Sequence, residues 1–250
     1  MNIKRTFFLF FMIILLPVLG QTKQSLAGNE MLRLVFTGNE MLSSSSLEKE
    51  VERELEDFFE SDFPEAKGDD AAFLIENLYR KTGYHFVSVE YRLKTEKDGT
   101  SLEFIVSEGP LVHVKDITVS GNTFFADDEL LSFFGGNIEG ILGFGGSVFV
   151  ESEIRDAISS IHNLYTSEGF LKVDIGKPVY TYTEDQSQVE IHISINEDIR
   201  ILIGKIDYKG EILEDAQEEL EDLARKLSGK PFLRRRKLIL RSGVREIYGN

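Results

Sequence analysis

The chain contains no cysteine, which excludes disulfide frameworks, thiolate metal sites, cysteine nucleophiles and a lipid-anchored cysteine at a cleavage site. Basic residues are outnumbered by acidic ones. The chain has 28 lysines and arginines against 43 aspartates and glutamates, and its net charge is −15. Duplex nucleic acid requires clustered lysine and arginine for its phosphates, so we expect no nucleic-acid partner.

Residues typical of catalysis are equally sparse. The four histidines have no metal-ligand spacing, and no serine lies in a nucleophile-elbow context. No pair of carboxylates is singled out for acid–base chemistry. The glycine-rich stretch 135–146 lacks the Gly-Lys-Ser/Thr ending of a phosphate-binding loop, so we expect an extended loop or a contact surface there. The sequence therefore predicts a protein that is not an enzyme and uses no cofactor or metal.

The one long apolar run lies at the N-terminus. Lys4 and Arg5 precede the run Phe7–Leu19, and residues 18–20 offer a cleavage site, which is the order of a secretory signal peptide. The run is shorter than the roughly twenty residues that cross a bilayer as a helix. We expect residues 1–20 to be removed on export, with an uncleaved N-terminal anchor as the alternative.

The rest of the chain repeats one pattern. Tyrosines at 79, 165 and 248 are 86 and 83 residues apart (165 − 79 and 248 − 165), and such a steady period indicates repeated modules. Each copy begins with a short apolar strand that ends at a glycine, as tight turns require. These turn glycines are Gly38, Gly121 and Gly210.

Two helical patterns follow each turn. In the first copy Ser45 and Glu48 have the spacing of a capping box, and apolar residues recur at helical intervals from 47 to 59. In the second copy Asp127 or Asp128 is the expected N-cap. The second helices lead to a tyrosine that stands four residues before a glycine and an aromatic residue. These junctions are Tyr79–Gly83-Tyr84 and Tyr165–Gly169-Phe170.

A hairpin closes each of the first two copies. The first alternates from Val87 to Leu93, turns at Lys97-Asp98-Gly99 and returns through residues 102–106. The second pairs 171–182 with 189–195. The third copy opens with a strand at 206–209 and breaks off before its hairpin, so we expect the natural chain to continue beyond Asn250.

The order strand, helix, helix, strand, strand predicts an α+β fold in which two helices pack on one face of a three-stranded sheet. The expected boundaries are 30–109 and 110–197 for two whole modules and 198–250 for the incomplete third.

This β-α-α-β-β order resembles the POTRA (polypeptide-transport-associated) domain. The glycine turns and the tyrosine–glycine–aromatic junctions carry the resemblance. Two motifs that open a second helix with a phenylalanine add to it: Gly146-Ser147-Val148-Phe149 and Gly229-Lys230-Pro231-Phe232. Tandem POTRA modules are similar to the arm of the Omp85 superfamily, and the resemblance covers the chain from about residue 30 onward.

The resemblance implies the periplasmic arm of an outer-membrane protein assembly factor, of the general or the autotransporter type. It implies three partners: unfolded outer-membrane proteins, accessory periplasmic lipoproteins, and the outer membrane through a C-terminal β-barrel that this sequence lacks. Clients would add a strand to an exposed sheet edge. The implied edge residues are Tyr84, Phe86, Val87, Val89, Tyr91 and Leu93 in the first module and Leu171, Val173, Ile175 and Val179 in the second.

Two other kinds of POTRA protein stay open at this point. One is a two-partner secretion transporter, which typically carries two modules, and the other is a division-type protein with one module and an uncleaved anchor. The single basic run, 234–237, is expected to be a solvated helix face paired with acids in 214–222. Its alternative is a site for an acidic partner or for phospholipid head groups.

Overall fold

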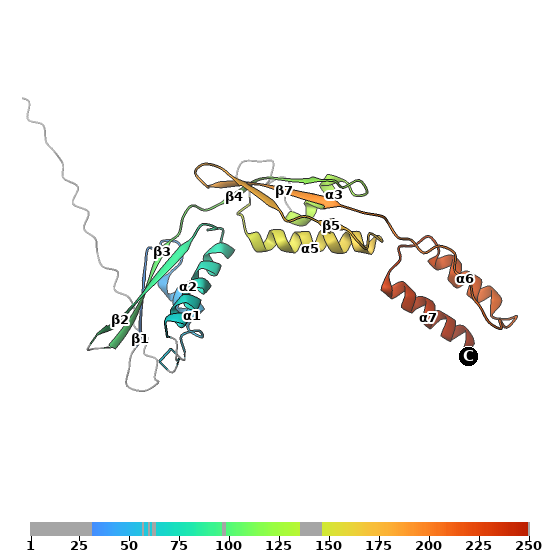
Figure 1. Ribbon diagram of the computed structural model, residues 1–250, viewed down its shortest axis with the longest axis horizontal. Helices are drawn as coiled ribbons and strands as arrows, with labels where there is room; N and C mark the ends of the chain where they lie inside the picture. Colours follow the sequence, from blue (N-terminus) through green and yellow to red (C-terminus); the bar gives the residue numbers. More distant parts are fainter. Residues whose placement is uncertain are drawn as a thin grey trace, which may run out of the picture. The chain divides into compact units, whose positions relative to one another are not determined.

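The computed structural model describes residues 32–249 apart from 57, 60, 62–63, 97–98 and 136–146. The predicted signal peptide, part of the first hairpin turn and the glycine-rich loop lie outside these residues. Helices and strands are mixed along the chain (Figure 1), which confirms the predicted α+β fold class. The chain divides into two compact units: residues 1–76 with 88–108, and residues 77–87 with 109–250.

The first unit is a three-stranded sheet with helices on one side. Its strands lie in the order β1 (Leu32–Thr37), β3 (Gly99–Ser107) and β2 (Ser88–Glu96), with β1 parallel and β2 antiparallel to β3. Helices α1 (Ser44–Val51) and α2 (Pro64–Lys81) lie on the same side of this sheet (Figure 1). This is the two-layer arrangement that the element order predicts.

Alternation along β3 builds the core of the first unit. Leu102, Phe104 and Val106 are at most 5% exposed. The helices contribute Leu47 and Ile75, which are fully buried. Successive side chains of a strand point to opposite faces, so the three buried residues of β3 share the face that the helices cover. Each such side chain contributes about 2 kcal/mol by leaving water.

The start and end of α1 differ from the sequence prediction. The N-cap is Ser43, whose hydroxyl accepts a hydrogen bond from the Ser46 N–H at 3.2 Å, so the predicted capping box at Ser45 is wrong. Four consecutive serines offer the same chemistry, and periodicity cannot choose among them. The helix ends at Val51, and Leu55 is buried in the turns that follow. The apolar spacing after Val51 therefore indicates buried residues and not a longer helix.

The second unit contains a four-stranded sheet and a long helix. Strand β4 (His113–Ser120) runs parallel to β7 (Gln188–Asn196), and β5 (Asp174–Ile175) and β6 (Val179–Tyr182) pair antiparallel with β7. Helix α5 (Glu151–Ser167) lies along one face of the sheet (Figure 1). The core gathers Ile154, Ile161 and Tyr165 of this helix with alternate residues of β7: Val189, Ile191, Ile193 and Ile195.

The first helix of the second copy is only one turn and a half long. Helix α3 (Asp127–Leu131) continues as a 3-10 turn, η1 (Ser132–Phe134). Its N-cap is Ala126, without a side-chain cap, so the predicted caps Asp127 and Asp128 are wrong. The Asp127 carboxylate instead accepts a hydrogen bond from the Asn122 amide at 2.7 Å. A side chain held in that way is turned toward the preceding turn and not toward the helix N–H groups.

The predicted strand 171–182 is interrupted. Residues 176–178 separate β5 from β6, and Pro178 has no N–H to give to a ladder. The Gly176 N–H still reaches the Ser194 carbonyl at 2.9 Å, so the chain stays beside β7 through the break.

The third copy supplies two helices, α6 (Gln217–Leu227) and α7 (Arg234–Tyr248). The predicted strand at 206–209 is wrong, because the structure has no strand there and only an isolated bridge joins Leu202 to Pro231. A strand needs a neighbour for its hydrogen bonds, and in the described part of the third copy no hairpin strand is present to pair with it.

Candidate functional site: sheet edges and the contacts that hold them

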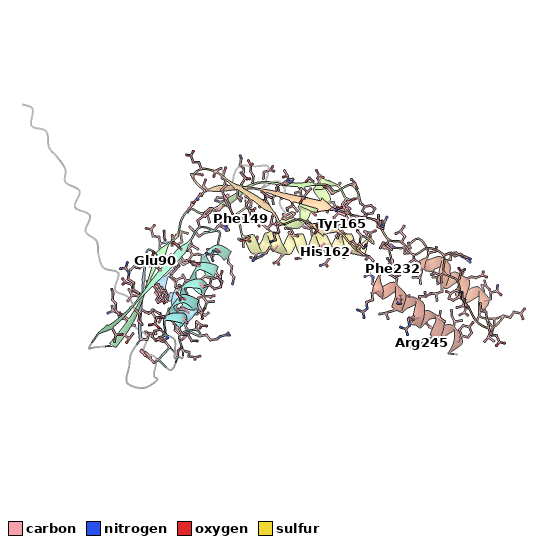
Figure 2. The ribbon with its side chains drawn as sticks, in the orientation of Figure 1. Glu90, Phe149, His162, Tyr165, Phe232 and Arg245 are labelled. Atoms are coloured by element: carbon pink, nitrogen blue, oxygen red, sulfur yellow. The ribbon has the colours of Figure 1, made fainter. Side chains whose placement is uncertain are left out.

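Strand β2 forms an uninterrupted edge of the first sheet. It pairs with β3 in continuous register from Ser88↔Ser107 to Glu96↔Gly99. In the described part of the chain, β3 is the only strand that pairs with it. Figure 2 labels Glu90 on this strand. One side of a nine-residue strand is thus left for another strand.

A hydrogen bond shows which backbone groups of β2 point away from β3. The Val89 N–H donates to Glu76 Oε1 on α2 at 3.1 Å, so it takes no part in the β2–β3 ladder. In an antiparallel pair the groups of every second residue point the same way. The N–H and carbonyl groups of Tyr91 and Leu93 therefore point outward as well, while those of Arg92 face β3.

Tyr91 fastens this edge to α2. Its hydroxyl donates to the Glu65 carbonyl at 2.8 Å, in the first turn of the helix. Its ring lies where a side chain at Gly68 would overlap it, so only a glycine in α2 leaves the room. The edge of β2 is therefore held beside the first half of α2.

The corresponding edge of the second sheet is shorter and broken. Ile175 ends β5, which has two residues, and Val179 begins β6, which has four. Leu171 and Val173 precede both strands. Leu171 is exposed, whereas Val173 is buried and unable to contact a client with its side chain. Lysine and proline in the break, at 177 and 178, are residues that natural edges use against strand addition.

Three of the predicted edge residues lie before β2. Tyr84, Phe86 and Val87 fall in the turn between α2 and that strand and belong to the second unit. Tyr84 and Val87 are buried, and the Phe86 ring lies 4.9 Å from that of Tyr182. The structure thus leaves Val89, Tyr91 and Leu93 as the predicted residues on a continuous edge.

Two motifs that are far apart in sequence meet in the second unit. The Gly83 carbonyl accepts a hydrogen bond from the Val112 N–H at 3.0 Å, and the Val112 carbonyl accepts one from the Phe149 N–H at 2.8 Å. We call this chain of contacts the Gly–Phe ladder. It recurs from Gly169 through Ile201 to Phe232, at 2.8 and 2.9 Å. The tyrosine–glycine junction and the glycine–phenylalanine motif are therefore two halves of one repeated contact.

The two ladders differ in what covers the phenylalanine. Phe149, which precedes α5 (Figure 2), is fully buried, with the rings of His85, Tyr180 and Tyr182 at 5.1, 5.3 and 6.2 Å. Burial lowers the pKa of His85 and raises those of both tyrosines to about 12. Phe232 is 45% exposed, and the described part of the third copy has no strand equivalent to β6.

A buried carboxylate, that of Glu197, holds the turn after Gly121 in place through hydrogen bonds, and we call this set of bonds the Glu197 lock. Glu197 accepts hydrogen bonds from the N–H groups of Thr123 and Phe124 at 2.8 Å, from the Thr123 hydroxyl, and from the Tyr165 hydroxyl at 2.8 Å. Burial alone would raise the pKa of Glu197, but these bonds outweigh it and the pKa is lowered. Tyr165 is the junction tyrosine at the end of α5 (Figure 2), and its hydroxyl links the helix to this lock.

The first unit has a similar turn. Glu108 accepts a hydrogen bond from the Met41 N–H at 2.8 Å, and the Asn39 amide donates to the Leu42 carbonyl at 2.8 Å. In the second unit the Asn122 amide donates to the Phe125 carbonyl at 3.0 Å in the same way. In the sequence, Glu108 and Glu197 are only parts of acidic turns, so their hydrogen bonds to the glycine turns were not predicted. The feature that could have indicated this role is that a glutamate directly follows the last strand of each hairpin.

The residues that the structure describes contain no group of three or more histidines, aspartates and glutamates that could hold a metal ion. Within the same residues, none of the helices combines the length and the apolar character needed to cross a membrane.

Comparison with protein families matches the POTRA family, described as surface antigen variable number repeat, at residues 33–109 and 112–198. Comparison with curated proteins gives no match. Among solved structures, POTRA domains 3–5 of BamA from Haemophilus influenzae are 14% identical, with a TM-score of 0.45 over 87% of this chain and 85% of that chain. The N-terminal domain of Omp85 from Thermosynechococcus elongatus is 12% identical (TM-score 0.39, 87% and 83%), and CdiB from Escherichia coli is 15% identical (0.32, 69% and 29%).

Proposed function

Because the chain belongs to the POTRA family, we propose that it is the periplasmic arm of an outer-membrane protein assembly factor of the Omp85 superfamily. In this role the chain is a scaffold without catalytic chemistry. It binds unfolded outer-membrane proteins and accessory lipoproteins after export. Two tandem modules of the family behind a sequence typical of a signal peptide support the proposal.

The repeated Gly–Phe ladder favours an assembly factor over a two-partner secretion transporter. A transporter of that kind typically carries two modules. The second ladder, from Gly169 to Phe232, connects the second copy to the start of a third, as the first ladder does for the copy before. A third module suits the assembly factor better.

The observation that carries client binding is the outward backbone of β2. Tyr91 and Leu93 present N–H and carbonyl groups that an incoming extended chain can use, and each added hydrogen bond contributes about 1 kcal/mol. Backbone groups are the same in every client, so such an edge accepts many sequences. The edge lies beside α2, where the Tyr91 ring covers Gly68.

We assign the client strand to β2 and not to β5 and β6. A strand added to β2 meets a regular edge of nine residues, whereas a strand added to the second sheet meets the break at Pro178. The N–H of Val89 already donates to Glu76, so the client pairs with β2 from Tyr91 toward the C-terminal end of the strand.

Replacing Leu93 with proline tests this assignment. The change removes an N–H that points outward, and the ladder to β3 does not use that group. We expect crosslinking of an unfolded β-barrel membrane protein, diluted from urea, to fall about fivefold or more, since the proline also blocks close approach of a partner strand. Leu93→Ala is the matched control, because it shortens the same side chain but keeps the N–H.

Circular dichroism must first show that both variants are folded. Equal crosslinking by the Leu93→Pro variant and the wild type would then contradict binding at β2. A loss that is as large in Leu93→Ala would assign the contact to the side chain and not to strand addition.

A further inference from the structure

Helix α7 is strongly basic although the chain is acidic. Of its fifteen residues six are lysine or arginine and one is glutamate, so the helix carries +5 (6 − 1) in a chain of −15. The expected pairing with the acids of 214–222 does not form in the described residues. The one ion pair found there joins Asp222 to Arg225 at 3.2 Å, and none involves the basic residues of α7.

The repeat shows that the fold does not need arginine at the first two positions of this helix. Helix α5, which follows Phe149 as α7 follows Phe232, begins Glu151-Ser152-Glu153. Helix α7 begins with three arginines, has no acid in its first turn and has no side-chain N-cap. Positive charge at a helix N-terminus opposes the macrodipole and lowers helix stability. Arg236 does make a structural contact, because its guanidinium donates a hydrogen bond to the Pro231 carbonyl at 2.7 Å. Arg234 and Arg235 make no such contact and are unfavourable for the helix, and a local rule broken without a structural gain points to function.

Three of the arginines and one leucine form a stripe along the side of α7 that faces away from α6. Arg234, Leu238, Arg241 and Arg245 are spaced by four, three and four residues, so they share one face of the helix. All four are exposed, Leu238 by 58%, and Figure 2 labels Arg245 on α7. The opposite face holds Gly243, where an added Cβ would lie 2.8 Å from Leu223 of α6. The stripe is about 17 Å long at the rise of an α-helix.

We propose that this arginine stripe binds an acidic segment of a partner polypeptide. Carboxylates pair with the guanidinium groups of Arg234, Arg241 and Arg245, which suit bidentate contact. An apolar side chain of the partner covers Leu238. The stripe is one helix wide, and Glu246 lies beside it on α7, in a chain whose net charge is −15. An acidic segment can follow such a line, whereas a planar anionic membrane would also be repelled by the negative charge of the rest of the chain.

A variant that copies α5 separates binding from folding. R234E/R235S gives α7 the first two residues of α5, so it removes an unfavourable charge from the helix start. We expect its Tm to rise while its affinity for the partner falls. If the arginines had a structural role, its Tm would fall. The second variant, R241E/R245E, removes the rest of the stripe without touching the helix start.

The probe is a labelled peptide of about sixteen residues, made of glutamate with leucine at helical intervals, and binding is followed by fluorescence anisotropy. We expect each variant to weaken binding about tenfold or more and added salt to weaken binding to the wild type. The control is K49E/K81E, which matches the charge change of R241E/R245E, alters two exposed lysines of α1 and α2 and should retain binding.

Equal loss of binding in the control would overturn the proposal, since the contact would then depend on net charge alone. Vesicles that contain phosphatidylglycerol form the second arm. Binding of the wild type to vesicles but not to the peptide would also overturn it and identify a membrane-facing helix. A Tm that falls in R234E/R235S would assign the arginines to the fold.

Discussion

Replacing Glu197 with glutamine is expected to lower the free energy of unfolding of the second unit by about 3 kcal/mol. The carboxylate is 8% exposed and accepts bonds from two backbone N–H groups and two hydroxyls. A glutamine can satisfy only part of this set, and its NH₂ group faces donors. Unpaired buried donors cost about 1–3 kcal/mol each. Hydrogen exchange of the amides of β7 reports the loss for this unit alone.

The hydrogen bonds of Glu197 also predict that the stability of the second unit depends on pH. The pKa of Glu197 is lowered in the folded chain from an ordinary value of 4.5, so the unfolded chain takes up the proton first. The stabilisation from Glu197 is complete above that ordinary value and is lost as the pH falls through the lowered, folded pKa. As the pH falls below about 4.5, the amides of β7 in the wild type should lose protection against exchange, after correction for intrinsic rates. The Glu197→Gln variant should not show this pH-dependent loss of protection. An identical pH response in both proteins would contradict the account of the lock.

Replacing Gly121 with alanine is expected to cost about 3 kcal/mol or more. The residue directly follows β4 and has φ of +87°, which alone disfavours a side chain. A Cβ there would also overlap the carbonyl oxygen of Ile195, and backbone of a central strand cannot move aside cheaply. The effect should appear as faster exchange throughout the sheet of the second unit, with the first unit as internal reference.

Gly229 is the matched control for this change. It has φ of +74°, yet no atom lies within 4 Å of the position of its Cβ. Gly229→Ala therefore carries only the conformational penalty, about 1 kcal/mol. If the two alanine variants lose the same stability, the close approach to Ile195 is not what makes a glycine necessary at position 121.

The sequence predicted those parts of the fold that depend on local chemistry. Turn glycines and apolar alternation are visible one residue at a time, so Gly121 and the core of β7 were predicted correctly. The role of Glu197 was missed because its four donors come from a turn and a helix that lie far away along the chain. Neither composition nor spacing distinguishes this buried glutamate from the exposed acids around it.

The candidate site was predictable only in outline. Alternation and family resemblance pointed to strands near Val89 and Val173, but they could not show which backbone groups face outward. That direction follows from one contact, the hydrogen bond between Val89 and Glu76. The break at Pro178 was visible in the sequence, yet its effect on the edge became clear only when β5 and β6 were seen on β7.

Residue-resolved hydrogen exchange along β2, with and without an unfolded β-barrel membrane protein, tests whether clients join the first sheet at this strand. The client should slow exchange at Tyr91 and Leu93, whose N–H groups point outward. Arg92 should change little, because its N–H is already bonded to β3. Protection that is absent from β2, or that appears on β5 and β6 instead, would contradict the proposal that clients join the first sheet at this edge.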